Sequence, residues 1–430
     1  MPPPKVYLRA KNPPSSARMK FEDYRISATI KRNLDELGFR RPTDIQYKAI
    51  PPILKGEDVL AIAQTGTGKT AAFAIPILHM LHERKASSRS EGIQCLVMVP
   101  TRELALQITE VFDRIGRHTR VKTFCVFGGV EQAPQIARLE RGIDILVSTP
   151  GRMFDLVSQG HIHLDRADIL VLDEADHMLD LGFIRDIRDA IKFLPRQRQT
   201  LFFSATINET IKDLAYSLVR KPIRIQISPK DPVSKNIQHA VAFVDMDDKR
   251  FFLERVIQEN PDSKILVFVR TKVRAERVMK AMERVNIAAE TIHGDKDQHD
   301  RLQVMQRFRN GTVKVLVATD VSARGIDIPD VDYVVNYDLP DVPENYVHRV
   351  GRTGRGMKKG LAVSFCSPEE RTTLAEIEGF LEKPIQVMNI GDKEYAATRD
   401  LSTEPKATWK DVMQEIDAAE KWMSKKKVKT

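Results

Sequence analysis

The chain has 430 residues, and because this length exceeds what one hydrophobic core usually serves, we expect two domains. Its 68 lysines and arginines outnumber its 59 aspartates and glutamates, so the net charge of +9 favours a polyanionic partner or substrate without identifying one. No apolar run approaches membrane-spanning length, and the N-terminal segment lacks the apolar core of a signal peptide, which predicts a soluble, cytoplasmic protein with no membrane partner.

Residues 1–20 hold five prolines and five basic residues with no acid, which predicts a flexible basic arm. After the arm, short β-rich runs alternate with longer amphipathic stretches. That alternation is typical of βα units in a parallel sheet. We therefore expect a first α/β lobe over residues 21–227, with strands at DVLAIAQ, QCLVMVP, KTFCVFGG, DILVSTP, ADILVLDE and QTLFFSAT.

A polar segment with two prolines, SPKDPVSKN, predicts a short flexible linker over residues 228–236. The alternation then resumes and predicts a second parallel-sheet lobe over residues 237–391. Its expected strands are VAFVD, KILVFVRT, AAETIHGD, KVLVATDV, YVVNYDLP and GLAVSFCS. Residues 392–430 contain too few apolar residues for a domain and end in WMSKKKVKT, so we expect a short C-terminal tail with a helix and a basic tip.

The stretch AQTGTGKT begins at Ala63 and lies between an apolar run and a helix-like stretch. Gly66 and Gly68 allow backbone conformations closed to other residues, so successive N–H groups can surround one anion. Lys69 adds a cation for the outer phosphates and Thr70 a hydroxyl for Mg²⁺, at the positive end of the next helix. The pattern predicts a nucleoside triphosphate site, although Ala63 replaces the glycine of the strict motif. Taken alone, a surface loop rich in glycine and threonine is the alternative.

Polar residues follow several expected strands, and ligands of open parallel sheets bind beyond the carboxyl ends of the strands. Asp173 and Glu174 follow the apolar run ILVL directly, where one carboxylate can hold Mg²⁺ and the next can orient or deprotonate a water. A solvated turn or a helix N-terminus is the alternative for this pair alone. Ser204 and Thr206 end another strand without the context of a hydrolase nucleophile, so we expect them to hydrogen-bond neighbouring motifs.

Arg349, Arg352 and Arg355 recur at a spacing of three in HRVGRTGR, so a helix would place them on one side. Gly351 and Gly354 would allow close approach. Guanidinium groups in this pattern could reach a γ-phosphate held by the other lobe. A solvated basic helix face is the alternative.

Two further residue patterns favour structural roles. Cys95, Cys125 and Cys366 are far apart and lie inside apolar strand-like runs, so we expect buried thiols and neither a disulfide framework nor a zinc site. The HIH segment at residues 161–163 has no accompanying cysteine or acidic cluster. We therefore interpret it as part of a loop before the strand that leads to Asp173.

The motifs FEDY, GFRRPTDIQ, AQTGTGKT, PTRELA, GG, TPGR, DEAD, SAT, VFVRT, HGDKDQHDR, ATDVSARGID and HRVGRTGR occur in one order along the chain. In this order they resemble the DEAD-box ATP-dependent RNA helicases, whose phosphate loop commonly begins with alanine. The short tail and HMLDLGF after DEAD resemble bacterial RhlE-type members. The resemblance implies two RecA-like lobes that bind ATP in their cleft and RNA across both lobes, and that close only when both ligands are present.

The resemblance also implies roles for single residues in the cleft. Lys69 and Thr70 would hold the phosphates and Mg²⁺, Asp173 would bind Mg²⁺ through water, and Glu174 would position the attacking water. The other residues of the ATP site would be the phosphate-loop members Ala63, Gln64, Thr65, Gly66, Thr67 and Gly68, the ribose contact Asp327, and the arginine fingers Arg352 and Arg355. The residues that couple the motifs would be Asp176, Ser204, Thr206 and His348.

Gln46 lies in the upstream motif GFRRPTDIQ. A glutamine amide offers an acceptor and donors that match the N6 and N7 groups of adenine, whereas guanine shows two acceptors along the same edge. We therefore interpret Gln46 as an adenine sensor, Phe39 as the stacking surface, and Phe21 as the upstream aromatic of the same motif. Single phenylalanines are usually core residues, so the motif context alone supports these two assignments.

The candidate RNA contacts are small or basic residues that would meet phosphates and sugars, so binding should not depend on base sequence. They are Arg102, Gly128, Gly129, Thr149, Gly151, Arg152, Arg301 and Thr319. Specificity would then come from the chain ends or from protein partners of RNA metabolism, and we expect the chain itself to be a monomer.

The sequence predicts an RNA-dependent ATPase that unwinds short RNA duplexes or remodels RNA–protein complexes. An alternative from another class is an ATP-gated RNA clamp, a scaffold whose slow turnover only times its release. A DNA translocase is disfavoured, because its motifs would differ from DEAD and SAT.

Overall fold

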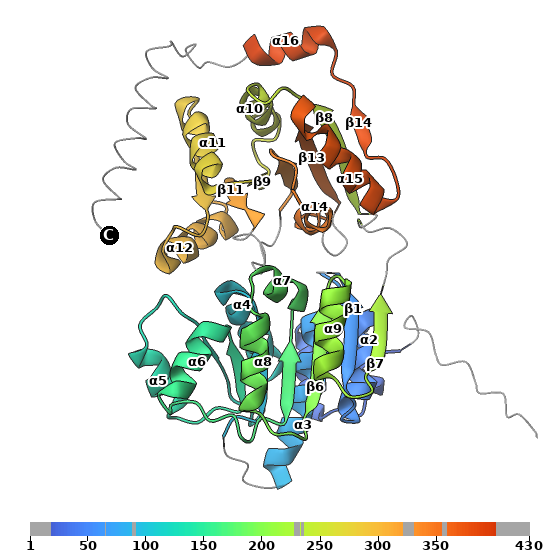
Figure 1. The fold of residues 1–430 in the computed structure, drawn as a ribbon, viewed down its shortest axis with the longest axis vertical. Coiled ribbons are helices and arrows are strands. Elements are labelled where there is room, and N and C mark those ends of the chain that lie inside the picture. The colour runs from blue at the N-terminus through green and yellow to red at the C-terminus, as the bar shows by residue number, and fades with distance from the viewer. Residues whose placement is uncertain are drawn as a thin grey trace, which may run out of the picture.

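The structure is a computed structural model that describes residues 19–64, 66–87, 92–227, 233, 236–320, 331–354 and 359–400. Two seven-stranded sheets, each flanked by helices, form two lobes (Figure 1). Neighbouring strands in both sheets are parallel. This confirms the predicted α/β fold with two parallel-sheet lobes.

The first sheet has the strand order β3-β4-β2-β5-β6-β1-β7. Its strands are β1 (Val59–Ala63), β2 (Cys95–Met98), β3 (Thr123–Val126), β4 (Ile145–Ser148), β5 (Ile169–Leu172), β6 (Gln199–Ser204) and β7 (Ile223–Ile227). The surrounding helices are η1 (Phe21–Asp23), α1 (Ala28–Glu36), α2 (Asp44–Leu54), α3 (Lys69–Ser87), α4 (Arg102–Ile115), α5 (Ala133–Leu139), α6 (Pro150–Ser158), α7 (Ala175–Asp180), α8 (Ile184–Lys192) and α9 (Glu209–Leu218).

The second sheet has the order β10-β11-β9-β12-β13-β8-β14. Its strands are β8 (Ile237–Phe243), β9 (Ile265–Val269), β10 (Ala289–Ile292), β11 (Val315–Thr319), β12 (Tyr333–Asn336), β13 (Gly360–Cys366) and β14 (Gln386–Met388). Its helices are α10 (Lys249–Glu259), α11 (Lys272–Arg284), α12 (Gln298–Arg309), α14 (Pro343–Val350), η2 (Pro368–Glu370), α15 (Arg371–Leu381) and α16 (Asp392–Asp400).

Strand β1 shows why the short apolar runs of the sequence form strands in a sheet that is covered on both faces. Every residue of β1 is buried. Val59, Ala61 and Ala63 belong to one hydrophobic cluster, whereas Leu60 and Ile62 belong to a second. Successive strand residues point to opposite faces, so both faces of the sheet carry a core. Only the strand ends remain for ligands, and the carboxyl ends of the first sheet point toward the second lobe (Figure 1).

The first residues of the C-terminal tail pack against the second lobe. Helix α16 lies beside α10, where the Arg255 guanidinium contacts Glu394 at 2.7 Å and Thr398 Oγ1 at 2.9 Å. The Tyr395 hydroxyl donates to Asp248 at 3.0 Å. The basic tip of the predicted tail lies outside the described residues, as do most of the predicted arm and linker, so these domain boundaries remain predictions.

Cys95, Cys125 and Cys366 are free and buried in β2, β3 and β13, which confirms the expected structural thiols. The HIH segment lies between α6 and β5. In the part of the chain that the structure describes, no helix is both long enough and apolar enough to cross a membrane.

Candidate nucleotide and RNA site

The phosphate loop joins the end of β1 to the start of α3, as its sequence pattern predicts. Gly66 and Gly68 adopt φ angles of +80° and +91°, in the left-handed region that favours glycine. The Thr67 hydroxyl donates to the Gln64 carbonyl at 2.7 Å and closes the turn. The loop therefore lies at a helix N-terminus, where the helix dipole favours an anion.

Lys69, the first residue of α3, places a buried cation in this loop. Its side chain is 6% exposed, and Nζ has no hydrogen-bond partner among the described residues. A buried ammonium without a partner is unfavourable, and a bound phosphate would pair with it. Nearby, burial raises the pKa of Asp173 to about 6, while the charge of Lys69 acts in the opposite direction. A buried carboxylate next to a phosphate site suits a hydrated Mg²⁺ ion.

Glu174 caps the N-terminus of α7 with a left-handed backbone, at φ +51°. Its N–H donates to Asp173 Oδ1 at 2.9 Å. Burial favours the neutral carboxyl, but the interaction with His177 and the positive charges of Lys69 and Arg352 outweigh it and lower the pKa of Glu174 to about 2. Glu174 is therefore ionised at neutral pH and can accept a hydrogen bond from a water.

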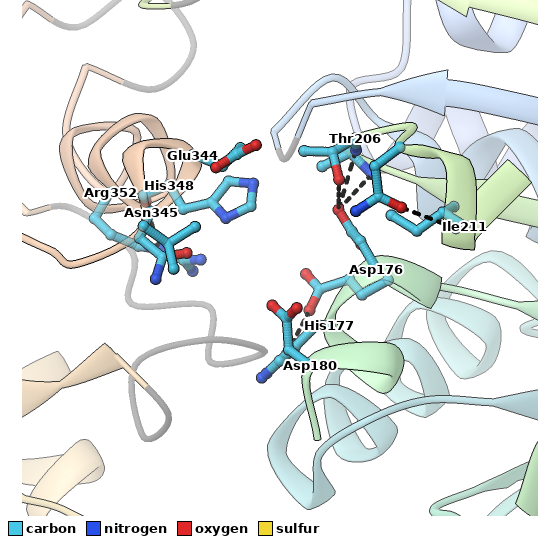
Figure 2. A pocket seen from close by; sticks show the side chains of 13 residues that line it. Asp176, His177, Asp180, Thr206, Ile211, Glu344, Asn345, His348 and Arg352 are labelled. Carbon is cyan, nitrogen blue, oxygen red and sulfur yellow. Dashed lines mark hydrogen bonds and ion pairs between the residues drawn. The ribbon is translucent and has the colours of Figure 1, made fainter. Parts of the chain in front are cut away.

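The DEAD and SAT motifs are in direct contact (Figure 2). Asp176 Oδ2 accepts hydrogen bonds from the N–H of Ala205 at 3.1 Å and from the N–H and hydroxyl of Thr206 at 3.0 and 3.2 Å. The Ser204 hydroxyl donates to the Thr206 carbonyl at 2.7 Å. The Thr206 hydroxyl therefore makes the expected hydrogen bond to a neighbouring motif, whereas the Ser204 hydroxyl bonds within its own motif. Because Asp176 links α7 to the end of β6, a shift of α7 would move the end of β6 with it.

A pocket between the lobes brings these groups together with α14. From the first lobe it is lined by Glu174, Asp176, His177, Asp180, Ala205, Thr206, Asn208 and Ile211. From the second lobe it is lined by Val342, Glu344, Asn345, His348 and Arg352. Figure 2 shows His348 and Thr206 on opposite sides of the space. The predicted water-positioning carboxylate and one predicted arginine finger thus line the same pocket from different lobes.

The prediction that three arginines of HRVGRTGR share one side of a helix is wrong. Helix α14 ends before Arg352, which therefore lies in the following turn. Arg349 is 1% exposed and forms a two-pronged ion pair with Asp320 at 2.6 and 2.7 Å, while its Nη1 donates to the Asp338 carbonyl at 2.6 Å. With its donors used inside the second lobe, Arg349 holds α14 against the sheet and cannot reach a phosphate across the pocket.

The upstream motif contacts the phosphate loop through Gln46. The buried Gln46 side chain accepts from the Thr43 N–H at 2.9 Å and donates to the Gly68 carbonyl at 3.1 Å, which leaves one N–H and one lone pair for a base. Phe21 and Phe39 are in edge-to-face contact, with their ring centroids 5.9 Å apart. Phe21 is buried in the core and Phe39 is half-buried, so Phe39 retains more surface for stacking.

Arginines from both lobes lie near one another, as the influence of Arg301 and Arg152 on Arg102 shows. Arg102 lies against Gly129, where an added Cβ would come within 2.0 Å of Arg102 Nη1. Burial, followed by the charges of Arg301 and Arg152, lowers the pKa of Arg102, and Glu103 acts in the opposite direction. Arg152 Nη1 and Arg301 Nε are buried and lack hydrogen-bond partners among the described residues. These unpaired donors suit an anionic ligand such as a phosphate backbone.

The smaller candidate RNA contacts lie near the same arginines or at element ends. An added Cβ at Gly128 would lie 3.8 Å from Arg102 Nη2, and one at Gly151 would meet nothing within 4 Å. Thr149 caps α6, and Thr319 ends β11. Their roles in RNA binding remain predictions.

Thr65, Asp327 and Arg355 lie outside the described residues, so their roles also remain predictions. Two residues that the sequence interpretation missed belong to the site. Glu103 pairs with Arg301 across the lobes at 2.7 Å, and His177 lies 3.5 Å from Glu174. The position of Glu103 next to Arg102 in PTRELA could have indicated its role. His177 follows DEAD directly, at a position that carries no motif signal.

Comparison with known proteins agrees with this geometry. The DEAD/DEAH box helicase family matches residues 43–214, and the helicase conserved C-terminal domain matches residues 248–357. The chain is 39% identical to the DEAD-box ATP-dependent RNA helicase RhpA of Helicobacter pylori over 370 residues, or 86% of this chain and 74% of RhpA. It is 41% identical to the ATP-dependent RNA helicase DbpA of Bacillus subtilis over 380 residues, or 88% of this chain and 78% of DbpA.

Solved structures share both lobes. Saccharomyces cerevisiae Dbp5 bound to RNA and ADP BeF3 has a TM-score of 0.76 at 28% identity, covering 89% of this chain and 99% of that chain. The DEAD-box helicase Mss116 bound to ssRNA and UDP-BeF has a TM-score of 0.78 at 26% identity, covering 90% of this chain and 82% of that chain. The RhlE-type assignment stays a prediction. The matched family regions, the relatives and the shared two-lobed fold show that this chain belongs to the DEAD-box ATP-dependent RNA helicases, with two RecA-like lobes.

Proposed function

We propose that the protein hydrolyses ATP in an RNA-stimulated manner and uses closure of its lobes to unwind short RNA duplexes or remodel RNA–protein complexes. The observation that carries this proposal is the shared pocket of Glu174 and Arg352, because it divides the hydrolytic machinery between the two lobes. The relatives are named as ATP-dependent RNA helicases, and the matched Dbp5 and Mss116 structures are bound to RNA and a nucleotide.

The first lobe would hold the nucleotide. Lys69 and the N–H groups around Gly66 and Gly68 would bind the phosphates. The buried Nζ of Lys69, which has no hydrogen-bond partner in the described part of the chain, supports this assignment. Thr70 and Asp173 would hold Mg²⁺, which when bound would neutralise part of the phosphate charge. Gln46 and Phe39 would contact the base, and Phe21 packs against Phe39. The first lobe would therefore bind ATP before the two lobes close.

Hydrolysis would require groups from both lobes. The ionised Glu174 would orient the attacking water, and Arg352 would stabilise charge on the transferred phosphoryl group, with Arg355 as the predicted second finger. An arginine finger contributes roughly 10³ to 10⁵ in rate. The open enzyme should therefore be nearly inactive.

RNA would stimulate hydrolysis because its binding surface also spans both lobes. Arg102 and Arg152 belong to the first lobe and Arg301 to the second, so one RNA strand bound by all three would favour the closed arrangement. Phosphate contacts carry no sequence information, so binding should not depend on sequence. The protein would act as a monomer in the cytoplasm, and protein partners would select the RNA.

The decisive test compares RNA with DNA as activator of ATP hydrolysis, alongside strand displacement of a short RNA duplex. We expect RNA to stimulate hydrolysis strongly, DNA to stimulate it little, and displacement to require ATP. An ATPase that responds equally to DNA would contradict the proposal. Slow hydrolysis with tight RNA retention and no displacement would instead indicate the ATP-gated clamp.

A further inference from the structure

The imidazole of His177 is a buried titratable group next to the catalytic centre with no assigned role. Its side chain is 5% exposed, and Nδ1 lies 3.5 Å from Glu174 Oε2. Neither ring nitrogen forms a hydrogen bond with a described residue. Burying a polar group without a partner is unfavourable, so an unpaired ring here points to a function outside packing.

The other charged groups around His177 have different contacts. Asp176, on the same helix, is occupied by the backbone and hydroxyl of the SAT motif. Asp180 lines the pocket farther along α7, and Glu344, His348 and Arg352 face it from the second lobe. The ring instead lies beside Glu174, whose side chain is 14% exposed.

Glu174 can orient a water only if its side chain is held in one position. Its φ of +51° is unusual for a residue other than glycine. The side chain has several rotatable bonds, whereas a water must be held in line with the phosphorus to react. A rigid imidazole beside one carboxylate oxygen would restrict that motion.

The geometry points to His177 as a positioning residue, whose Nδ1–H donates to Glu174 Oε2 and directs the carboxylate toward the attacking water. This inference rests on the proposed function and adds a specific residue to it. The low pKa of Glu174, which the neighbouring His177 helps to lower, agrees with such a contact. Closing the remaining gap to an ordinary hydrogen-bond length requires a small movement of either side chain.

Three substitutions at His177 test the contributions of the two ring nitrogens separately. In His177→Asn the side-chain amide nitrogen can occupy the place of Nδ1, in His177→Gln it reaches the place of Nε2, and in His177→Leu neither donor is present. We expect His177→Leu to lower the RNA-stimulated kcat roughly ten- to one-hundredfold, as a misplaced reacting group does, with the KM for ATP unchanged. His177→Asn should retain most of the rate and His177→Gln should not.

A matched control is His163→Leu, which removes an exposed histidine from the same lobe and should leave the rate unchanged. Thermal unfolding of each variant reports on folding. If His177→Leu does not fold, the comparison of Asn with Gln still decides. Equal rates for the Asn and Gln variants, or a raised KM with unchanged kcat, would overturn the inference.

A double-mutant cycle gives an independent readout. If His177 acts through Glu174, adding His177→Leu to Glu174→Gln should cause no further loss in the residual rate, because the carboxylate it positions is already absent. Additive losses would assign His177 a structural role. Failure of the proposed function would appear differently, as a wild-type protein without RNA-stimulated hydrolysis, whereas failure of this inference leaves the wild type active.

Discussion

Arg301 in α12 of the second lobe forms an ion pair with Glu103 in α4 of the first lobe, with 2.7 Å between Nη2 and Oε1. The two side chains are only 14% and 6% exposed. Loss of one member of a buried ion pair leaves an uncompensated charge, so the pair favours the arrangement in which the lobes meet. Arg301 is also a candidate RNA contact, which links lobe closure to RNA binding through one guanidinium.

Glu103→Gln should weaken the coupling between ATP and RNA while preserving the shape of the side chain. We expect the factor by which RNA tightens ATP binding to fall roughly tenfold, since coupling energies of this size are typical of two-site linkage. The measurement is the Kd of an ATP analogue with and without saturating RNA. Glu110→Gln, an exposed acid on the same helix, is the control, and an unchanged factor in Glu103→Gln would remove the pair from coupling.

Lys69→Ala should abolish ATP binding, because it removes a buried cation that has no hydrogen-bond partner among the described residues. Glu174→Gln should bind ATP and RNA normally and stop turnover, because only the water-orienting carboxylate is lost. Binding by nucleotide fluorescence and steady-state phosphate release distinguish the two, with the exposed Lys55→Ala as control. A Glu174→Gln protein that hydrolyses ATP at the wild-type rate would exclude Glu174 from the mechanism.

Discrimination between ATP and GTP should depend on Gln46. Guanine would leave the free amide groups of this buried side chain unpaired, which favours ATP by roughly 1 to 3 kcal/mol. Gln46→Ala should shrink that difference. It should also lower the affinity for both nucleotides, because the hydrogen bond to the Gly68 carbonyl is lost. Ratios of kcat/KM for ATP and GTP measure the effect. Equal wild-type rates with the two nucleotides would refute the assignment.

Arg352→Ala should slow RNA-stimulated turnover by roughly 10³-fold with little change in ATP affinity when RNA is absent, because this group reaches the phosphate only when the lobes close. The predicted finger Arg355 should behave in the same way. Arg349→Ala is the contrasting variant. Loss of its pair with Asp320 should lower stability by about 3–5 kcal/mol, visible as a lower unfolding midpoint. If Arg352→Ala weakens ATP binding without RNA as much as it slows turnover, it is not a finger.

The basic C-terminal tip should strengthen RNA binding at low salt. It contains Lys425, Lys426, Lys427 and Lys429, outside the helicase motifs and outside the described residues. Truncation after Lys421 should weaken RNA binding most at low ionic strength and reduce the salt slope by roughly one unit per lost phosphate contact, with the maximal ATPase rate intact. A salt titration tests this, and an unchanged slope would indicate a solvated tail without a role in binding.

Features encoded in contiguous segments could be predicted from the sequence. The apolar runs that became β1 and β5 are short and continuous, as strands buried on both faces must be. The phosphate loop could also be predicted, because Gly66, Gly68 and Lys69 lie in one short segment between a strand and the next helix. The order of motifs then identified the family, and the position of each motif at a strand end indicated which residues could share a cleft.

Contacts between distant segments required the tertiary structure. The sequence interpretation placed Arg349 beside Arg352 on one helix side, yet α14 ends between them and Arg349 pairs with Asp320 inside the second lobe. The pairing of Arg301 with Glu103 and the burial of His177 beside Glu174 likewise could not be predicted from the sequence. Local pattern determines whether a segment forms a helix or strand, but the partner of a buried charge depends on which distant segment excludes water from it, and only the packed lobes decide that.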